Sequence, residues 1–198
     1  WGLSPLGDSH VLPLIATADL ILLAGYDPIE MRTSWVTPWR ADQAPVIEFA
    51  AVANTHYVHQ ASLSFIGDIG AGLRALREDV APRDVWPDGE PGKTRKALAA
   101  AFPIDEEWGP AAICDELRRT LRDDALVSVD TGAHRILLNC MWKCRQPHTL
   151  IQSSAFGSMG CGLPLAIGAK LSDPDRDVVA VTGDAGLEMI LGELATLR

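Results

Sequence analysis

DVVAVTGDAGLEM, residues 177–189, is the stretch that decides the fold of this chain. Val178 to Val181 form a short apolar run, rich in β-branched residues, that is typical of a buried parallel strand. Two glycines then precede a helical spacing of apolar residues, so the stretch predicts a strand, a tight turn and a helix. Asp184 lies in this turn, where a carboxylate could hold a divalent cation beside a phosphate. Taken alone, the feature also fits a plain turn and helix cap.

Composition is that of an ordinary globular protein. The chain has 198 residues, 47% of them hydrophobic, and a net charge of −9. No basic face is evident, so nucleic acid is not an expected partner. No apolar run approaches the ~18 residues of a membrane span and the opening lacks a signal pattern, so we expect no membrane partner and a cytoplasmic location. The chain begins at Trp1 without Met and ends inside a helical pattern, which predicts a piece of a longer protein.

The first half of the chain alternates strands with loops or helices. Its apolar runs predict three strands and one helix, at residues 19–25, 45–51, 63–66 and 67–78. This order predicts a parallel α/β layer rather than a β-sandwich. We assign residues 1–80 to a first partial domain. Prolines and glycines interrupt the pattern in residues 81–108, which we assign to a linker with a brief helix at 94–102.

Residues 109–198 repeat the strand and helix order and form a second predicted unit. Three strands are expected, at residues 125–129, 150–152 and 178–181, among helices at 110–122, 133–143 and 160–171. Polar or glycine-rich segments follow the three strands, at 130–134, 153–162 and 182–186. Right-handed crossovers place these segments at one edge of the sheet, as the walls of one pocket. The predicted fold class is α/β, with two partial three-layer α/β/α units built on parallel sheets.

Cysteines and histidines give no clear metal site. Cys140 and Cys144 lie one helical turn apart, but further ligands are not evident. His56 and His59 lack a third ligand, and we favour a surface loop for them. All four cysteines are interpreted as small buried hydrophobes in a reducing compartment, namely Cys114, Cys140, Cys144 and Cys161.

A glycine-rich loop precedes the helix at 160–171, and its spacing permits close backbone approach to a ligand. The segment that runs from this loop through residues 177–189 is GSMGCGLPLAIGAKLSDPDRDVVAVTGDAGLEM. On this segment, the run from Ser128 to Arg198 resembles the C-terminal, diphosphate-binding domain of thiamine diphosphate-dependent enzymes, particularly the acetolactate synthase group. Residues 14–79 resemble, more weakly, part of that family's Rossmann-like central domain. The resemblance implies thiamine diphosphate and Mg²⁺ as cofactors. FAD is disfavoured because no acidic residue follows the strand at 45–51 where the family recognises a ribose.

The resemblance also implies a set of site residues. Asp184 matches the family's Mg²⁺-binding aspartate, and the backbone amides of Ala185 and Gly186 would contact phosphate oxygens. Met159 matches the apolar residue that holds the cofactor bent, with a core methionine as the alternative. Met189 would face the pocket or the core. The full predicted cofactor-binding set is Gly132, His134, Ser154, Ala155, Ser158, Met159, Gly183, Asp184, Ala185, Gly186 and Met189.

Two departures from the family's pattern fall in this set. Ala133 replaces a glutamine between Gly132 and His134, in the turn that contacts the diphosphate; without the resemblance, His134 would be interpreted as a helix-start cap. Ser154 and Ala155 replace a pair of glycines next to the pyrimidine ring. We therefore expect one hydrogen bond fewer and a narrower site.

The implied activity is decarboxylation or carboligation of a 2-oxo acid such as pyruvate, by an acetolactate synthase-like lyase or transferase that forms a homodimer or homotetramer. In the family, the activating glutamate comes from an N-terminal domain of the partner chain. No catalytic residue is therefore assigned in this sequence, and the isolated chain is expected to be inactive. Two alternatives stay open: a related decarboxylase of aryl or acyl-CoA 2-oxo acids, and a non-catalytic nucleotide-binding or assembly module.

Overall fold

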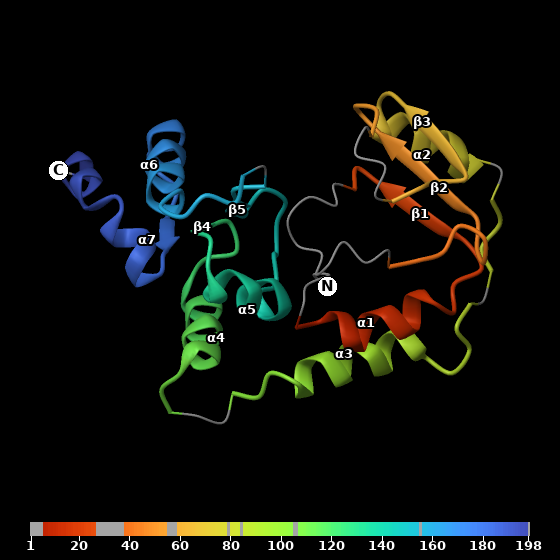
Figure 1. Cartoon of the computed structure of the whole chain (residues 1–198), viewed down its shortest axis with the longest axis horizontal. Coiled ribbons are helices and arrows are strands. Elements are labelled where there is room, and N and C mark those ends of the chain that lie inside the picture. Colours follow the sequence, from red (N-terminus) through yellow and green to blue (C-terminus); the bar gives the residue numbers. More distant parts are fainter. Residues whose placement is uncertain are drawn as a thin grey trace. The chain divides into compact units, whose positions relative to one another are not determined.

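The computed structural model describes residues 6–26, 38–54, 59–78, 80–83, 85–104, 107–154 and 156–197. The chain divides into two compact units, one formed by Gly7–Leu98 and the other beginning at Ala99. Both units are parallel α/β layers (Figure 1), which confirms the predicted fold class. The boundary falls inside the predicted linker, and the division into 1–80, 81–108 and 109–198 stays a prediction.

The first unit is built on a parallel sheet of three strands in the order β1-β2-β3. These strands and the helices of the unit are β1 (Ile21–Ala24), β2 (Val46–Ala50), β3 (Leu63–Ile66), α1 (Asp8–Ile15), α2 (Ile69–Glu78) and α3 (Glu90–Ala100). Leu23 and Val46 pack with Trp39 in its core. Each predicted strand is present, which shows that the apolar runs locate the strands correctly.

Helix α3 differs from the brief helix predicted at 94–102. It starts earlier, at Glu90, directly after Gly89, which has a φ of +71°. Glu90 lies in the first turn, where the helix dipole favours a carboxylate. Leu98 is the buried residue of this helix. The turn before α3 and the burial of Leu98 explain why part of the expected linker is regular structure.

One predicted surface loop is wrong in part. His59 is buried, with its ring centroid 5.7 Å from that of Tyr26 and 5.3 Å from that of Trp39. An aromatic cluster can accept a histidine ring because the flat face and edge of the imidazole pack against neighbouring rings. His56 lies outside the described residues.

The second unit is a parallel sheet with the strand order β5-β4-β6. Its elements are α4 (Pro110–Thr120), β4 (Leu126–Val129), α5 (Ala133–Met141), β5 (Leu150–Gln152), α6 (Gly162–Ser172), β6 (Val178–Val181), α7 (Asp184–Glu188) and the 3₁₀ helix η2 (Leu191–Leu197). Val127 of the central strand is in register with Leu150 on one side and Val179 on the other. The carboxyl end of β4 therefore lies between those of β5 and β6.

The core of the second unit lies between β4 and two helices. Val127 and Val129 are fully buried and pack against Cys114 of α4 and Leu138 of α5. Cys114 is the buried hydrophobe that the sequence predicted. Cys144 is exposed, so that interpretation is wrong for it, because it follows the end of α5 instead of facing the core. In the part of the chain that the structure describes, no helix is long and apolar enough to cross a membrane.

Candidate cofactor site

Asp130 occupies the centre of the candidate site, immediately after β4. Its side chain is completely buried. Oδ1 accepts hydrogen bonds from the backbone N–H of Thr131 at 2.7 Å and of Cys161 at 3.2 Å, while Oδ2 accepts one from Gly160 N–H at 2.9 Å. The Cys161 thiol adds a fourth donor, 3.3 Å from Oδ1. The end of β4 is thereby joined to the loop that precedes α6.

These donors decide the charge state of Asp130. Burial raises the pKa of its carboxyl group, but the hydrogen bonds from Thr131, Gly160 and Cys161 outweigh it and hold the pKa below its ordinary value. A buried carboxylate that accepts several N–H bonds favours its ionised form. Asp130 is therefore a carboxylate at neutral pH, with its charge stabilised by backbone donors.

Two glycines make room for this carboxylate. A Cβ on Gly162 would lie 2.8 Å from Cβ of Asp130 and 3.0 Å from its backbone nitrogen. A Cβ on Gly186 would collide with Oδ2 of the same side chain. The start of α6 and helix α7 therefore both pack directly on Asp130, and the absence of a side chain at each glycine is required by that contact.

A hydrogen bond from Ser128 also joins β4 to the start of α6. The hydroxyl of Ser128, which is fully buried, donates to the carbonyl oxygen of Gly162 at 2.7 Å. Ser128 and Asp130 are two residues apart around the end of β4, so their side chains reach the same side of the sheet. Both attach the beginning of α6 to the central strand.

His134 lies close to the two glycines that follow β4 and β6. A Cβ on Gly132 would lie 2.7 Å from Cε1 of its imidazole, and a Cβ on Gly183 would lie 3.4 Å from the same atom. Its Nε2 is a buried atom that has no hydrogen-bond partner among the described residues. Gly132, not His134, is the cap residue of α5. The helix-cap alternative for His134 is therefore wrong, and a buried polar atom is left for a ligand.

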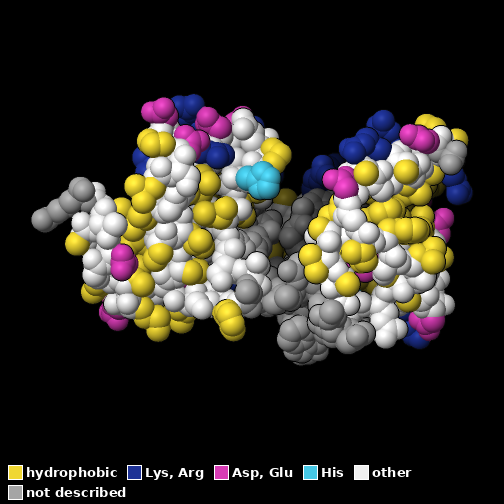
Figure 2. All heavy atoms as spheres, turned by 90° about the horizontal axis from the view of Figure 1, so that it is seen from above, with side chains coloured by type: hydrophobic (Ala, Val, Ile, Leu, Met, Phe, Trp, Pro, Cys, Tyr) yellow, Lys and Arg dark blue, Asp and Glu magenta, His cyan; other side chains and the backbone are white. Residues whose placement is uncertain are grey.

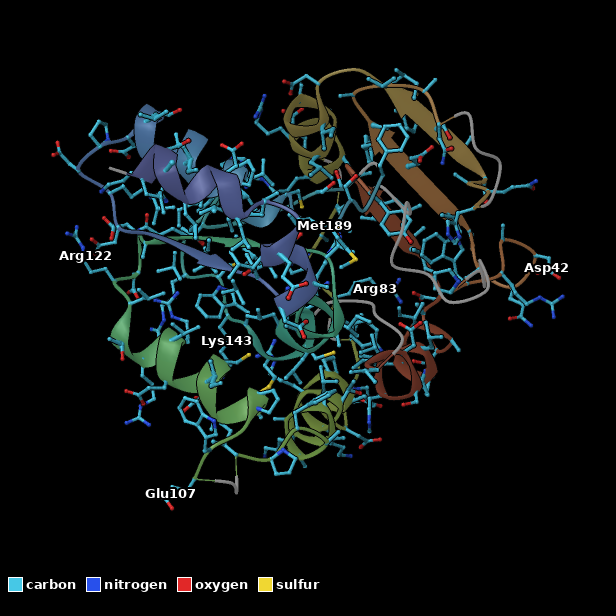
Figure 3. All side chains as sticks on the ribbon, turned by 60° about the vertical axis from the view of Figure 1, so that its left-hand side comes forward. Asp42, Arg83, Glu107, Arg122, Lys143 and Met189 are labelled. Carbon is cyan, nitrogen blue, oxygen red and sulfur yellow. The ribbon has the colours of Figure 1, made fainter. Side chains whose placement is uncertain are left out.

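The loop before α6 also touches α7. Gly160 has a φ of +83°, a conformation that favours glycine, and a Cβ there would lie 3.0 Å from Ile190 and 3.6 Å from Cβ of Met189. Met159 is 42% exposed and Met189 is 67% exposed. Met189 lies at the end of α7, as Figure 3 shows. Both side chains are therefore outside the buried core of the described residues.

The remaining predicted residues are on the surface of the site. Asp184 opens α7 and is exposed, and its Oδ1 accepts a hydrogen bond from the backbone N–H of Ala185 at 2.8 Å. Ser154 and Ser158 are exposed and take no part in the contacts given above. Ala155 lies outside the described residues. Within those residues, no three His, Cys, Asp or Glu side chains cluster to hold a metal ion.

At the candidate site, sequence reasoning missed two buried charged residues, Asp130 and Arg135. Asp130 was placed only within a predicted pocket wall, although its position directly after a strand and before Thr-Gly is the signal that could have singled it out. Arg135 of α5 is also buried, and donates from Nε to Gln152 Oε1 at 3.1 Å and from Nη1 to Thr131 Oγ1 at 3.3 Å. Gln152 in turn donates to Asn139 at 2.8 Å. This network joins the ends of β4 and β5 through α5.

A cavity of about 310 Å³ lies elsewhere in the second unit, at the start of α4. Apolar side chains line it, from Phe102, Pro103 and Ile104 on one side to Pro110 and Leu137 on the other. None of the predicted site residues is among its lining residues. The cavity is therefore separate from the cluster around Asp130.

The candidate site coincides with a known domain family. Residues 130–198, which contain all of the cluster except Ser128, match the family described as thiamine pyrophosphate enzyme, C-terminal TPP binding domain. Thiamine pyrophosphate is another name for thiamine diphosphate. The chain is also 28% identical to acetolactate synthase of Bacillus subtilis over 192 residues, which cover 92% of this chain and 33% of that protein. Residues 130–198 thus match the thiamine diphosphate-binding domain, and the chain is similar to acetolactate synthases over most of its length.

Two further acetolactate synthases match this chain. The mitochondrial acetolactate synthase catalytic subunit of Aspergillus candidus is 30% identical over 210 residues, covering 96% of this chain and 30% of that protein. Chloroplastic acetolactate synthase 3 of Brassica napus is 40% identical over 144 residues, covering 69% of this chain and 22% of that protein. The chain thus spans about a third or less of the length of these curated relatives.

The residues present fit the family's cofactor. Gly132 and Gly183 follow β4 and β6, at the carboxyl ends where parallel α/β sheets bind ligands, and Gly160 and Gly186 lie in the loop before α6 and in α7. The unpartnered Nε2 of His134 offers a hydrogen-bonding atom beside two of them. Asp184 adds an exposed carboxylate at the N-terminus of α7. An anion with a hard cation is the ligand chemistry that suits this donor set.

Proposed function

We propose that this chain provides the diphosphate- and Mg²⁺-binding part of an acetolactate synthase-like enzyme. The observation that carries the proposal is the buried, unpartnered Nε2 of His134, held beside Gly132 and Gly183 within the segment that matches the cofactor-binding domain. A buried polar atom without a partner costs free energy of about 1–3 kcal/mol unless a ligand satisfies it. An oxygen of a bound diphosphate would supply that partner.

The other residues have complementary parts in the proposal. Asp184 would ligate Mg²⁺, because that ion is commonly held by one or two carboxylates together with substrate phosphates. The backbone amide of Gly186 would donate to a phosphate oxygen at the start of α7, and the amide of Ala185, which donates to Asp184 Oδ1 in this structure, would exchange that partner for a phosphate oxygen when Asp184 ligates the cation. Ser154 and Ala155 would lie near the pyrimidine ring, with Ser158 in the loop that follows.

Met159 and Met189 would present apolar surface to the organic part of the cofactor, and their exposure leaves that surface open. Bound thiamine diphosphate supplies a nucleophilic carbon and an electron sink for the chemistry of 2-oxo acids. The task of this chain is to bind the diphosphate end and hold the rings in place. No general acid or base is assigned among its residues.

For the whole protein, we propose decarboxylation and carboligation of a 2-oxo acid such as pyruvate, as the names of its relatives suggest. A homodimer or homotetramer fits the exposed apolar side chains near the site, which include Phe156 at 94% exposure, Met159 and Met189. Apolar side chains are also widespread on the face drawn in Figure 2. The lyase or transferase class, the inactivity of the isolated chain and the cytoplasmic location stay predictions.

Calorimetry with thiamine diphosphate and Mg²⁺ tests the proposal. We expect Asp184→Ala to weaken Mg²⁺-dependent binding by tenfold or more, about 1.4 kcal/mol, without lowering the unfolding temperature, because the side chain is exposed. Glu188→Ala, which removes another exposed carboxylate from α7, is the matched control and should bind as the wild type does. Equal affinity of wild type and Asp184→Ala would exclude the metal-ligand role. Absence of binding by the wild type would exclude the cofactor site.

A further inference from the structure

We propose that Asp130 is the positioning residue of the cofactor site, a buried carboxylate that holds the Met159–Cys161 turn against the end of β4 and sets its distance from α7. The inference rests on the proposed function for its link to the cofactor, whereas its structural part stands on the contacts of Asp130 alone. Asp130 touches no proposed ligand atom and acts through the backbone that it holds.

The hydrogen bonds of Asp130 are directed at one short turn. Two of its four donors are the consecutive backbone amides of Gly160 and Cys161, and a third is the Cys161 thiol. A single buried side chain therefore supplies the acceptors for the backbone directly after Met159. Because Met159 is 42% exposed and directly precedes the two amides that Asp130 binds, the position of its backbone helps to decide where its side chain points.

Steric contact adds a second constraint. The same carboxylate fills the space where Gly186 lacks a Cβ, so α7 cannot move toward β4. Gly160 in turn packs against Met189 and Ile190 beyond α7. The side chain of Asp130 thus sets the distance between the loop before α6 and the start of α7. The glycine at 186 is explained by Asp130, in addition to any contact of its amide with a phosphate.

The two constraints are separable by mutation. Asp130→Asn keeps the size of the side chain, and so its contact with Gly186, but replaces one acceptor oxygen with an amide donor that cannot accept from a backbone N–H. The Met159–Cys161 turn loses part of its support, while the start of α7 keeps its spacing from β4. A variant that merely lowered stability would affect both segments equally.

The test compares two probes on wild type and Asp130→Asn, in the complete polypeptide that contains this chain. We expect the dissociation constant of thiamine diphosphate with Mg²⁺ to rise about tenfold, the effect of losing one charge-assisted hydrogen bond. The dissociation constant of inorganic pyrophosphate with Mg²⁺, a probe that needs only the start of α7 and His134, should change less than about twofold. Equal loss for both probes, or loss for neither, would overturn the positioning role.

A readout without cofactor separates this inference from the proposed function. The Cys161 thiol donates to Asp130, so at pH 8 we expect Asp130→Asn to raise the rate of Cys161 alkylation by iodoacetamide several-fold. The exposed Cys144 serves as the internal standard, and both rates are followed by peptide mass spectrometry. If wild type binds neither probe, the proposed function fails, and the Cys161 rate still decides whether Asp130 holds the turn. An unchanged rate would show that it does not.

A second variant covers the case in which Asp130→Asn does not fold. Gly186→Ala keeps Asp130 and displaces its carboxylate through the new methyl group, so Cys161 should again be alkylated faster. Gly168→Ala is the control, because a Cβ at Gly168 has no neighbour within 4 Å. Equal Cys161 rates in the two glycine variants would contradict the inference.

Discussion

The hydroxyl of Ser128 donates a hydrogen bond to the carbonyl oxygen of Gly162, 34 residues further along the chain, at 2.7 Å. This contact joins the central strand of the second unit to the start of α6, and both of its ends are buried. Ser128 lies two residues before Asp130, and the carboxylate of Asp130 holds the same loop. The end of β4 therefore organises the candidate site through side chains that bind backbone rather than ligand.

Ser128→Ala should lower the free energy of unfolding by about 1–3 kcal/mol, because the Gly162 carbonyl would be buried without its partner. Equilibrium urea denaturation measures the effect. Ser172→Ala is the matched control, since its hydroxyl also donates to a carbonyl, that of Gly168 at 2.9 Å, but in an exposed position. It should stay within about 0.5 kcal/mol of wild type. Similar losses in both variants would mean that burial of the Ser128 bond has no special weight.

The negative charge of Asp130 should make the free energy of unfolding depend on pH in the acid range. Its folded-state pKa is lowered, so the ionised form stabilises the fold at pH values above the unfolded-state pKa of about 3.9. That contribution is lost as the pH falls through the folded-state value. We expect Asp130→Asn to be less stable than wild type at pH 6 and to approach it as the pH falls below about 4. Asp175→Asn, an exposed site, should follow wild type. Parallel curves for wild type and Asp130→Asn would contradict the assignment.

Arg118→Lys should destabilise the second unit by about 1–2 kcal/mol, although it keeps the positive charge. Arg118 is buried, and its Nη2 donates to the carbonyl oxygens of Leu121 and Arg122, both at 2.9 Å. Its guanidinium also lies 5.1 Å from the ring centroid of Trp142. A lysine ammonium cannot reproduce the planar fork that makes these contacts together.

Arg119→Lys provides the control for Arg118. Arg119 is exposed and forms ion pairs with Asp115 and Glu116, each at 3.6 Å. Exposed pairs of this kind contribute about 0–1 kcal/mol, and lysine can replace arginine in them. Thermal unfolding of both variants makes the comparison, and a larger loss for Arg119→Lys than for Arg118→Lys would contradict the prediction.

Gly72→Ala should destabilise the first unit by about 1–3 kcal/mol, because the new methyl group would overpack its core. A Cβ there would lie 2.6 Å from Cδ1 and 2.8 Å from Cε1 of Phe49. Phe49 is buried and stacks on Phe65 at 5.3 Å, which limits its movement. Gly92→Ala in α3 has open space and should instead gain about 0.5–1 kcal/mol from helix propensity. A gain in both variants, measured by urea denaturation, would show that Phe49 yields freely.

The local sequence pattern was enough to predict the strands and helices of the second unit. The strands at 150–152 and 178–181 have the bounds that their apolar runs predict. Helix α4 begins at Pro110 as expected, because proline is well placed in a first helical turn. Such signals are carried by neighbouring residues, so they can be recognised without the fold.

Contacts between distant residues were harder to predict. Whether a histidine such as His59 is buried depends on aromatic partners at other places in the chain, Tyr26 and Trp39. The exposure of Met159 and Met189 likewise follows from how α7 packs, and an apolar residue type does not distinguish a core position from an open one.

The sequence by itself determined the α/β class, the order of strands and helices, and the glycine-rich and acidic turns at the strand ends, because these depend on residue type and short spacing. Only the tertiary structure decided the strand order β5-β4-β6 and the burial of Asp130. Apart from the adjacent Thr131, the donors and glycines that surround this carboxylate come from segments 30 or more residues away, and a charge of this kind is stable in the interior only once they are assembled around it.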